Sequence, residues 1–182
     1  MATTRLMTAD DLLALPDDGH QYELIEGVLH RMSPAGFEHS AYGIRIATFL
    51  TVWVDERDLG VVVGADTGFV FGHDPDTVRA PDVAFVHADR LPPPAERQGY
   101  GAMVPDLAVE IVSPNDRMSE VDAKIGFYLD AGVRLVWKVE PRPRAVTVRE
   151  PGRAPAVLGV GDTLDGGDVL PGFRLLIADI FR

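Results

Sequence analysis

The sequence contains no cysteine among its 182 residues, which excludes disulfide bonds, thiolate metal sites and a cysteine nucleophile. It also lacks any apolar run near the ~18 residues that a membrane-spanning helix requires. Its first twenty residues have no apolar core of the kind found in signal peptides. From these absences we expect a cytoplasmic protein with no membrane partner.

Positive charge is scarce, and lysine is the scarcest source of it. The chain has 17 basic and 28 acidic residues, a formal net charge of -11, and its only lysines are Lys124 and Lys138. This balance argues against a generally basic, histone-like nucleic-acid coat and against docking on anionic lipid, although it leaves room for a local basic surface. Residues 134–153 carry six basic and two acidic residues, a local balance of +4. They are either a phosphate-contacting surface or an ordinary solvated hairpin.

The patterning of the chain predicts one α/β domain spanning residues 1–182. Apolar residues spaced by three and four predict helices at 38–56 and 119–131, and Thr8 can cap a short helix ending near residue 15. Strands are predicted at 22–25, 28–32, 61–63, 68–71, 83–86, 106–112, 133–139 and 145–149. Residues 91–105 are rich in proline and glycine and predict an exposed loop. The mixture favours three layers around a central sheet.

Two carboxylates stand out beside predicted strands. Glu110 is the only ionisable residue in the apolar run 107–112, and an isolated buried carboxylate costs several kcal/mol unless it is paired or bound to a metal. The alternative is an edge-strand glutamate that faces water. Asp82 follows Pro81 just before another strand, which turn chemistry alone could explain. Together, two hard carboxylates on neighbouring strands can hold Mg²⁺ with several waters.

Lys124 lies on or beside the apolar face of its predicted helix, three residues after Val121 and four before Tyr128. The alternative is a lysine whose stem is buried and whose ammonium reaches water. In a chain that otherwise uses arginine, a compact ammonium suggests a requirement that the guanidinium fork does not meet. Glu120, one turn earlier, is a candidate ion-pair partner.

Glu23 is a fourth candidate, in a short predicted strand that begins at Tyr22. It alternates along the strand with apolar neighbours. The alternative to a site residue is therefore a glutamate on the solvent-facing side of a hairpin. The residue pattern alone favours that alternative.

Asp82, Glu110 and Lys124, together with several ordered segments, resemble the Uma-two family of the PD-(D/E)XK restriction-endonuclease-like superfamily. These segments run in family order across nearly the whole chain: YELIEG (22–27), MSPAGFEH (32–39), APDVAFV (80–86), DLAVEIVSPND (106–116), FYLDAGV (127–133) and VLPGF (169–173). The resemblance implies a restriction-endonuclease-like core, in which a mixed central β-sheet is flanked by helices and the site lies at one end.

The resemblance also implies roles for individual residues. Asp82 and Glu110 would hold Mg²⁺ (or Mn²⁺), Lys124 would be the catalytic lysine, and Glu23 would be an accessory acid. His39 lies in a family motif and would support the site or the fold. The superfamily motif places lysine two residues after the glutamate, where this chain has Val112, and Lys124 on the following helix would replace it. Lysine suits this role as a point charge on a flexible stem, and burial can lower the pKa of a lysine.

These observations predict a Mg²⁺-dependent endonuclease that hydrolyses DNA phosphodiester bonds, acting as a homodimer that presents two sites to one duplex. One alternative is a nuclease fold with degraded activity that serves as a protein or nucleic-acid interaction module. Another is a hydrolase of a smaller phosphate ester. The intact acidic and lysine set favours the enzyme, and the acidic surface favours the interaction module.

Overall fold

The computed structural model describes residues 5–182. Residues 1–4, which belong to the first twenty residues discussed above, lie outside the described part of the chain. Its centre is a six-stranded sheet in which only β7 and β8 run parallel, which makes the sheet mixed. The strands, in spatial order, are β10 (Ala156–Leu158), β9 (Ala145–Arg149), β8 (Leu135–Glu140), β7 (Leu107–Ile111), β6 (Val83–His87) and β3 (Gly60–Gly64).

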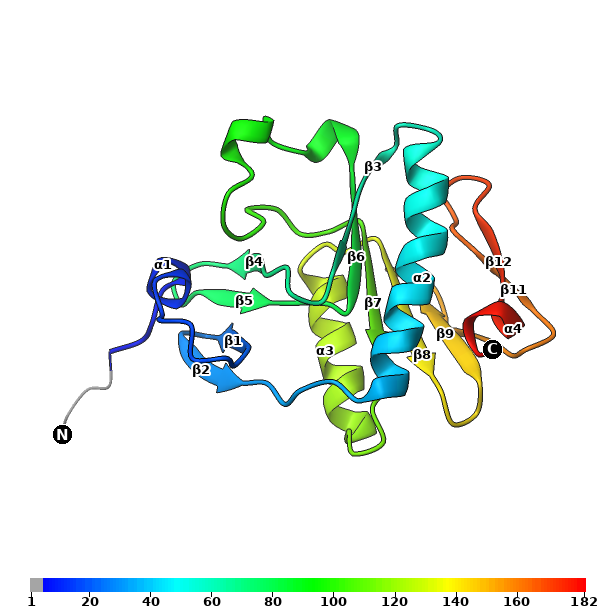
Figure 1. The fold of residues 1–182 in the computed structure, drawn as a ribbon, viewed down its shortest axis with the longest axis horizontal. Helices are drawn as coiled ribbons and strands as arrows, with labels where there is room; N and C mark the ends of the chain where they lie inside the picture. Colours follow the sequence, from blue (N-terminus) through cyan, green and yellow to red (C-terminus); the bar gives the residue numbers. More distant parts are fainter. Residues whose placement is uncertain (1–4) are drawn as a thin grey trace.

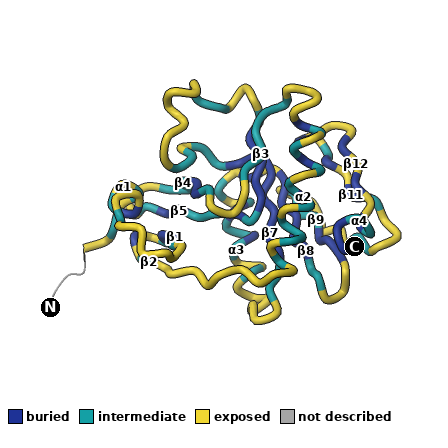
Figure 2. Tube along the Cα trace, viewed as in Figure 1, coloured by how far each residue is buried: buried dark blue, intermediate teal, exposed yellow. Residues whose placement is uncertain are grey.

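Two long helices cover opposite faces of this sheet (Figure 1). Helix α2 (Phe37–Asp55) packs on the face that carries Val109, and helix α3 (Met118–Asp130) packs on the face that carries Ala108. Side chains of one strand alternate between faces, so Glu110 shares the α3 face with Ala108. The predicted arrangement of a mixed sheet flanked by helices is therefore confirmed, and its strands form the buried centre of the molecule (Figure 2).

A second, four-stranded sheet lies beside the first, in the order β2-β1-β5-β4 (Figure 1). Its strands are β1 (Tyr22–Ile25), β2 (Val28–Arg31), β4 (Phe69–Gly72) and β5 (Thr77–Arg79), and α1 (Ala9–Leu13) packs against it. The sequence predicted the β1–β2 hairpin and the Thr8 cap of α1. It did not predict β5, whose three residues are too few for a visible alternation.

The C-terminal elements close the α2 side of the core. They comprise β11 (Thr163–Asp165), β12 (Arg174–Leu176) and α4 (Ile177–Ile180). Just before β12, Phe173 stacks on Trp137 of β8, with ring centroids 5.8 Å apart. The predicted loop at 91–105 is largely exposed and holds one 3-10 turn, Pro94–Glu96, after another at Ala88–Arg90. Within residues 5–182, no helix combines the length and the apolarity needed to cross a membrane.

Candidate active site

Glu110 lies near the end of β7, a strand flanked by β6 and β8 and buried at all five positions. Helix α3 supplies both of its side-chain partners. Lys124 donates a hydrogen bond of 3.1 Å from Nζ to Glu110 Oε2, and the Tyr128 hydroxyl donates one of 2.8 Å to Oε1. Lys124 and Tyr128 are four residues apart, so they lie on the same face of the helix. The buried, paired glutamate is confirmed, and the edge-strand alternative is wrong.

Glu23 contacts the same lysine from the second sheet. Its Oε1 lies 3.2 Å from Lys124 Nζ and accepts a hydrogen bond of 3.1 Å from the Ala80 backbone amide. The side chain is buried because β1 pairs with β5, which brings the start of the β5–β6 connection against it. The solvent-facing alternative for Glu23 is therefore wrong.

The candidate partner Glu120 is also wrong for Lys124. The Glu120 carboxylate is mostly exposed and lies 3.2 Å from the Arg117 guanidinium. The Lys124 stem instead turns from α3 toward β7, where two buried carboxylates offer a stronger field than one exposed carboxylate.

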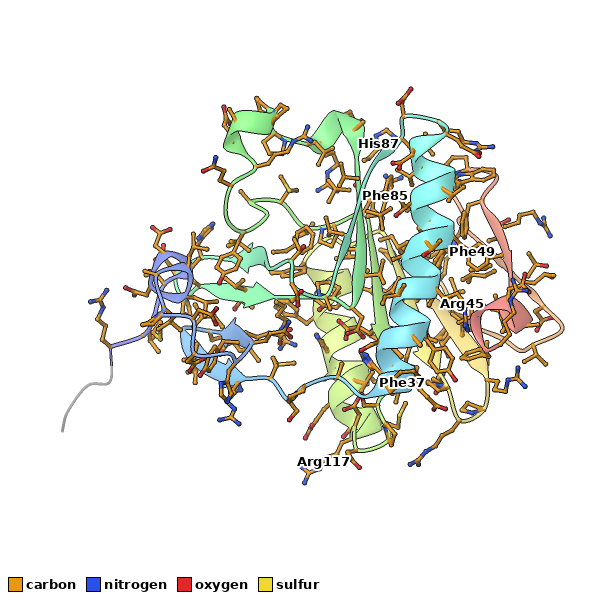
Figure 3. The ribbon with its side chains drawn as sticks, viewed as in Figure 1. Phe37, Arg45, Phe49, Phe85, His87 and Arg117 are labelled. Atoms are coloured by element: carbon orange, nitrogen blue, oxygen red, sulfur yellow. The ribbon has the colours of Figure 1, made fainter. Side chains whose placement is uncertain are left out.

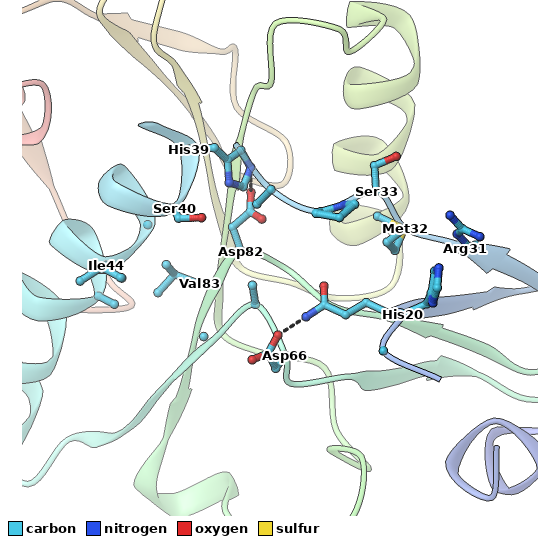
Figure 4. A pocket seen from close by; sticks show the side chains of 18 residues that line it. His20, Arg31, Met32, Ser33, His39, Ser40, Ile44, Asp66, Asp82 and Val83 are labelled. Carbon is cyan, nitrogen blue, oxygen red and sulfur yellow. Dashed lines mark hydrogen bonds and ion pairs between the residues drawn. The ribbon is translucent and has the colours of Figure 1, made fainter. Parts of the chain in front are cut away.

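Asp82 precedes β6 and is held at the end of β7 next to Glu110. Its Oδ2 accepts a hydrogen bond of 2.7 Å from the backbone amide of Ile111 and lies 3.2 Å from His39 Nε2. Among the hydrogen bonds of residues 5–182, none ends on Asp82 Oδ1. All four predicted site residues thus meet at one end of the central sheet. His39 reaches Asp82 from the first turn of α2, as Figure 4 shows.

The charges of this cluster perturb one another. Burial raises the pKa of Glu110 to about 7, an effect that Lys124 opposes and that the negative charge of Asp82 reinforces. Burial also disfavours the charged form of Lys124, but the carboxylates of Glu110 and Glu23 outweigh it and raise the lysine pKa above its usual range. Burial therefore acts on Lys124 in the expected direction, but the two carboxylates reverse the net shift of its pKa. The hydrogen bond to Asp82 raises the pKa of His39, although burial works against it.

The donor set suits a hard divalent cation. Two carboxylates, Asp82 and Glu110, lie close enough for the charge of one to raise the pKa of the other, and a bound cation would relieve that repulsion. Over residues 5–182, no three histidine, cysteine or acidic side chains are grouped as a metal centre. An ion here would therefore complete its shell with water. Mg²⁺ usually retains several waters and binds through one or two carboxylates, so the residues fit it.

Tyr128 and Arg79 belong to this cluster and were not recognised from the sequence as site residues. Tyr128 was assigned only to the apolar stripe of α3, although its place one turn after Lys124 could have indicated a shared partner. Arg79 comes from the unpredicted β5. Its Nη1 lies 4.0 Å from Glu23 Oε2, and its guanidinium carbon lies 5.0 Å from the centre of the Phe127 ring.

The basic residues of 134–153 are largely bound within the protein. Lys138 is buried, and its Nζ lies 3.0 Å from Asp122 Oδ1 and 3.8 Å from Glu140 Oε1. Arg134 lies 3.4 Å from the fully buried Asp106. These pairings favour the ordinary hairpin over a phosphate-contacting surface.

A mixed sheet between two helices, with acidic residues and a lysine gathered at one end, is the architecture of restriction-endonuclease-like proteins. The chain belongs to the Uma2 family, whose model carries the description "Putative restriction endonuclease" and matches residues 9–178. The predicted family is therefore confirmed.

A solved structure supports the same fold. It is a crystal structure described as that of "a putative nuclease belonging to DUF820" from Anabaena variabilis ATCC 29413. The two chains are 23% identical and superpose with a TM-score of 0.82, over 96% of this chain and 97% of the other. No curated protein matches the chain.

Proposed function

We propose that the protein is a Mg²⁺-dependent endonuclease that hydrolyses DNA phosphodiester bonds, with Mn²⁺ as an alternative ion. The family and the solved neighbour support nuclease function in general. The observation that carries the proposal is the position of Lys124. Its ammonium contacts Glu110 from the following helix. A cation therefore lies beside the strand glutamate, although Val112 occupies the position two residues after Glu110 where the superfamily motif has its lysine.

Each residue has a distinct task in this proposal. A divalent ion held by Asp82 and Glu110 would supply positive charge at the scissile phosphate and lower the pKa of a bound water. The carboxylates of Glu110 and Glu23 raise the pKa of Lys124, which favours its charged form. Its ammonium would stabilise charge that develops on the phosphate oxygens.

The remaining contacts position these groups. Glu23 holds the Lys124 ammonium from the second sheet and is itself fixed by the Ala80 amide. Tyr128 fixes one oxygen of Glu110. The Ile111 amide and His39 both lie against Asp82 Oδ2, which leaves Oδ1 for an ion.

Cleavage of plasmid and oligonucleotide DNA in Mg²⁺ or Mn²⁺ tests the proposal. We expect Glu110→Gln and Lys124→Met each to reduce cleavage by at least about a hundredfold. Lys138→Met is the matched control, because it removes the other buried lysine, which also lies against two carboxylates. Absence of cleavage by the wild type across salt concentrations and substrates would refute the proposal and favour the interaction module. Cleavage that survives Glu110→Gln would refute the choice of site.

A homodimer remains part of the prediction, in which the two copies would present two sites to one DNA molecule. Sedimentation of the full chain with and without DNA measures it directly. A monomer under both conditions would contradict it.

A further inference from the structure

A cleft of about 590 Å³ opens beside the carboxylate cluster (Figure 4). Its walls come from the segments that flank the β1–β2 hairpin and from the N-terminal half of α2, and residues 64–66 complete it. Asp82 and His39 belong both to this cleft and to the cluster. Its volume is within the range of about 300–1,000 Å³ that is typical of sites for small organic ligands. A ligand in the cleft would therefore reach Asp82 and His39, the two residues that the cleft shares with the proposed reaction centre.

The α2 wall of the cleft begins with His39 and Ser40 and continues with apolar residues, of which Ile44 is open to solvent. Ile44, which lines the cleft, has 70% of its surface exposed, and Ala47 lies one turn further along the same wall. Met32 contributes a third apolar side chain from beyond β2. An exposed isoleucine in the lining of a cleft indicates a surface that a flat apolar group can cover.

The opposite wall carries a cation. Arg31 ends β2 and lines the cleft, and no carboxylate of residues 5–182 forms a salt bridge with its guanidinium. In a chain of net charge -11, a guanidinium at the rim that forms no salt bridge suits a phosphate. The hydroxyls of Ser33 and Ser40 are further polar groups on the lining.

The apolar wall continues along α2 beyond the cleft. Phe37, at the first position of the helix (Figure 3), is 91% exposed. Ile44 comes seven positions after it, about two helical turns, so the two side chains lie on one face, about 10 Å apart along the helix axis. Ala41 lies between them on that face, and Thr48 lies one turn after Ile44. None of these four side chains is charged. An exposed aromatic ring is a stacking platform for a base.

We propose that this cleft binds one unpaired nucleotide of a DNA strand, with its base against Ile44, a neighbouring phosphate on Arg31 and the scissile phosphate at Asp82 and Lys124. The adjacent base would stack on Phe37. This inference rests on the proposed function and names its substrate as single-stranded or locally unpaired DNA.

Two further observations favour an unpaired strand over a continuous duplex. The side chains of Asp82, Glu110 and Lys124 are only 11–18% exposed, so a phosphate must enter a recess, which a flexible single strand does most easily. Residues 1–91 carry 15 acidic residues and six arginines, a balance of -9. A surface with this charge can contact only a few backbone phosphates. We therefore expect the affinity for DNA to depend only weakly on salt concentration.

Binding of a fluorescent oligonucleotide, measured by anisotropy in Ca²⁺ with the full chain, tests the proposal separately from cleavage. We expect the single strand to bind at least about tenfold more tightly than the same strand in a blunt duplex. Ile44→Glu and Arg31→Ala should each weaken binding of the single strand by roughly tenfold. Val52→Glu is the matched control, because Val52 is 55% exposed on the same helix and lies outside the cleft. Phe37→Ala should weaken binding without altering the charge.

The outcomes separate this inference from the proposed function. Equal or tighter binding of the duplex, or equal effects of Ile44→Glu and Val52→Glu, would overturn the nucleotide cleft even if DNA is cleaved. Conversion of a dimer to a monomer by Ile44→Glu would overturn it in favour of a contact between two copies of the chain. The expected binding pattern without any cleavage would support the cleft and refute the nuclease. Preference for an RNA strand over the DNA strand would overturn the stated substrate.

Discussion

Glu110 and Lys138 are register partners on the parallel strands β7 and β8, and each forms its closest ion pair with helix α3. The lysine of the helix, Lys124, binds the strand glutamate, and the acid of the helix, Asp122, binds the strand lysine. The two pairs have opposite polarity and fix α3 against the sheet at adjacent positions. Thr147 of β9 extends this polar row beyond Lys138 and donates a hydrogen bond of 2.8 Å to Glu140.

We expect the stability of the metal-free protein to fall as pH rises through the titration of Glu110. Burial raises its pKa from 4.5 to about 7, so between these values the folded chain holds a proton that the unfolded chain has lost. The free energy of unfolding should therefore decrease with pH across this window and level off above about pH 7. Relative to Glu110→Gln, the wild type should lose up to about 3 kcal/mol.

Urea unfolding at a series of pH values in EDTA measures this difference. Glu96→Gln, at an exposed position, is the control and should follow the wild type. Parallel stability curves for the wild type and Glu110→Gln would contradict the prediction.

Tyr128→Phe should raise the pKa of Glu110 further. The hydroxyl donates its hydrogen bond to the ionised carboxylate and so lowers that pKa. Removing it should shift the titration of Glu110 to higher pH and reduce the free energy of unfolding by about 1 kcal/mol at neutral pH. Carboxyl-carbon NMR of the metal-free protein follows the titration. Tyr42→Phe, on a half-buried ring of α2, should leave it in place, and an unchanged midpoint in Tyr128→Phe would count against the bond.

The pair formed by Lys138 and Asp122 should contribute a measurable coupling energy. A double-mutant cycle with Lys138→Met and Asp122→Asn isolates it, and we expect about 1 kcal/mol. The value is modest because the Asp122 side chain is 49% exposed and solvent screens the pair. Additive effects of the two substitutions on the free energy of unfolding would show that the pair does not help to hold α3.

Asp106→Asn should destabilise the protein without changing the chemistry of the folded molecule. Asp106 is fully buried, accepts a hydrogen bond of 2.9 Å from the His87 amide and lies 2.7 Å from the Arg90 guanidinium. Loss of its charge leaves these donors weakly paired and should cost about 2–4 kcal/mol. Thermal unfolding measures the loss, and DNA cleavage per folded molecule at low temperature is the control. A selective loss of cleavage would instead place Asp106 in the site.

The helices and strands that could be predicted are those whose formation depends on residues within the same segment. The spacing of apolar residues located α2 and α3, and the continuous apolar run located β7 with its single acid, Glu110. Strands β5 and β10 have three residues each, which is too short for a periodic signal, and they form because a neighbouring strand pairs with them.

The site shows the same division between local and distant causes. Glu110 and Lys124 were recognisable because each is a charge in an apolar setting. Glu23 looks like an ordinary exposed strand residue, because its burial depends on β5 and on the Ala80 amide, 57 residues away. The partner of Lys124 was misjudged for a related reason, since helical spacing indicates only neighbours on the same helix.

The two lysine amines give the protein an unusual reporter of motion. The side chain of Lys124 is 16% exposed and that of Lys138 is 11% exposed, and each ammonium is bound to carboxylates. The other cationic side chains of the chain are arginines and histidines. Acylating reagents react with free, deprotonated amines and not with guanidinium groups. Slow acylation at either lysine would therefore record the transient separation of α3 from the sheet, and the rate would follow the local opening free energy of that helix.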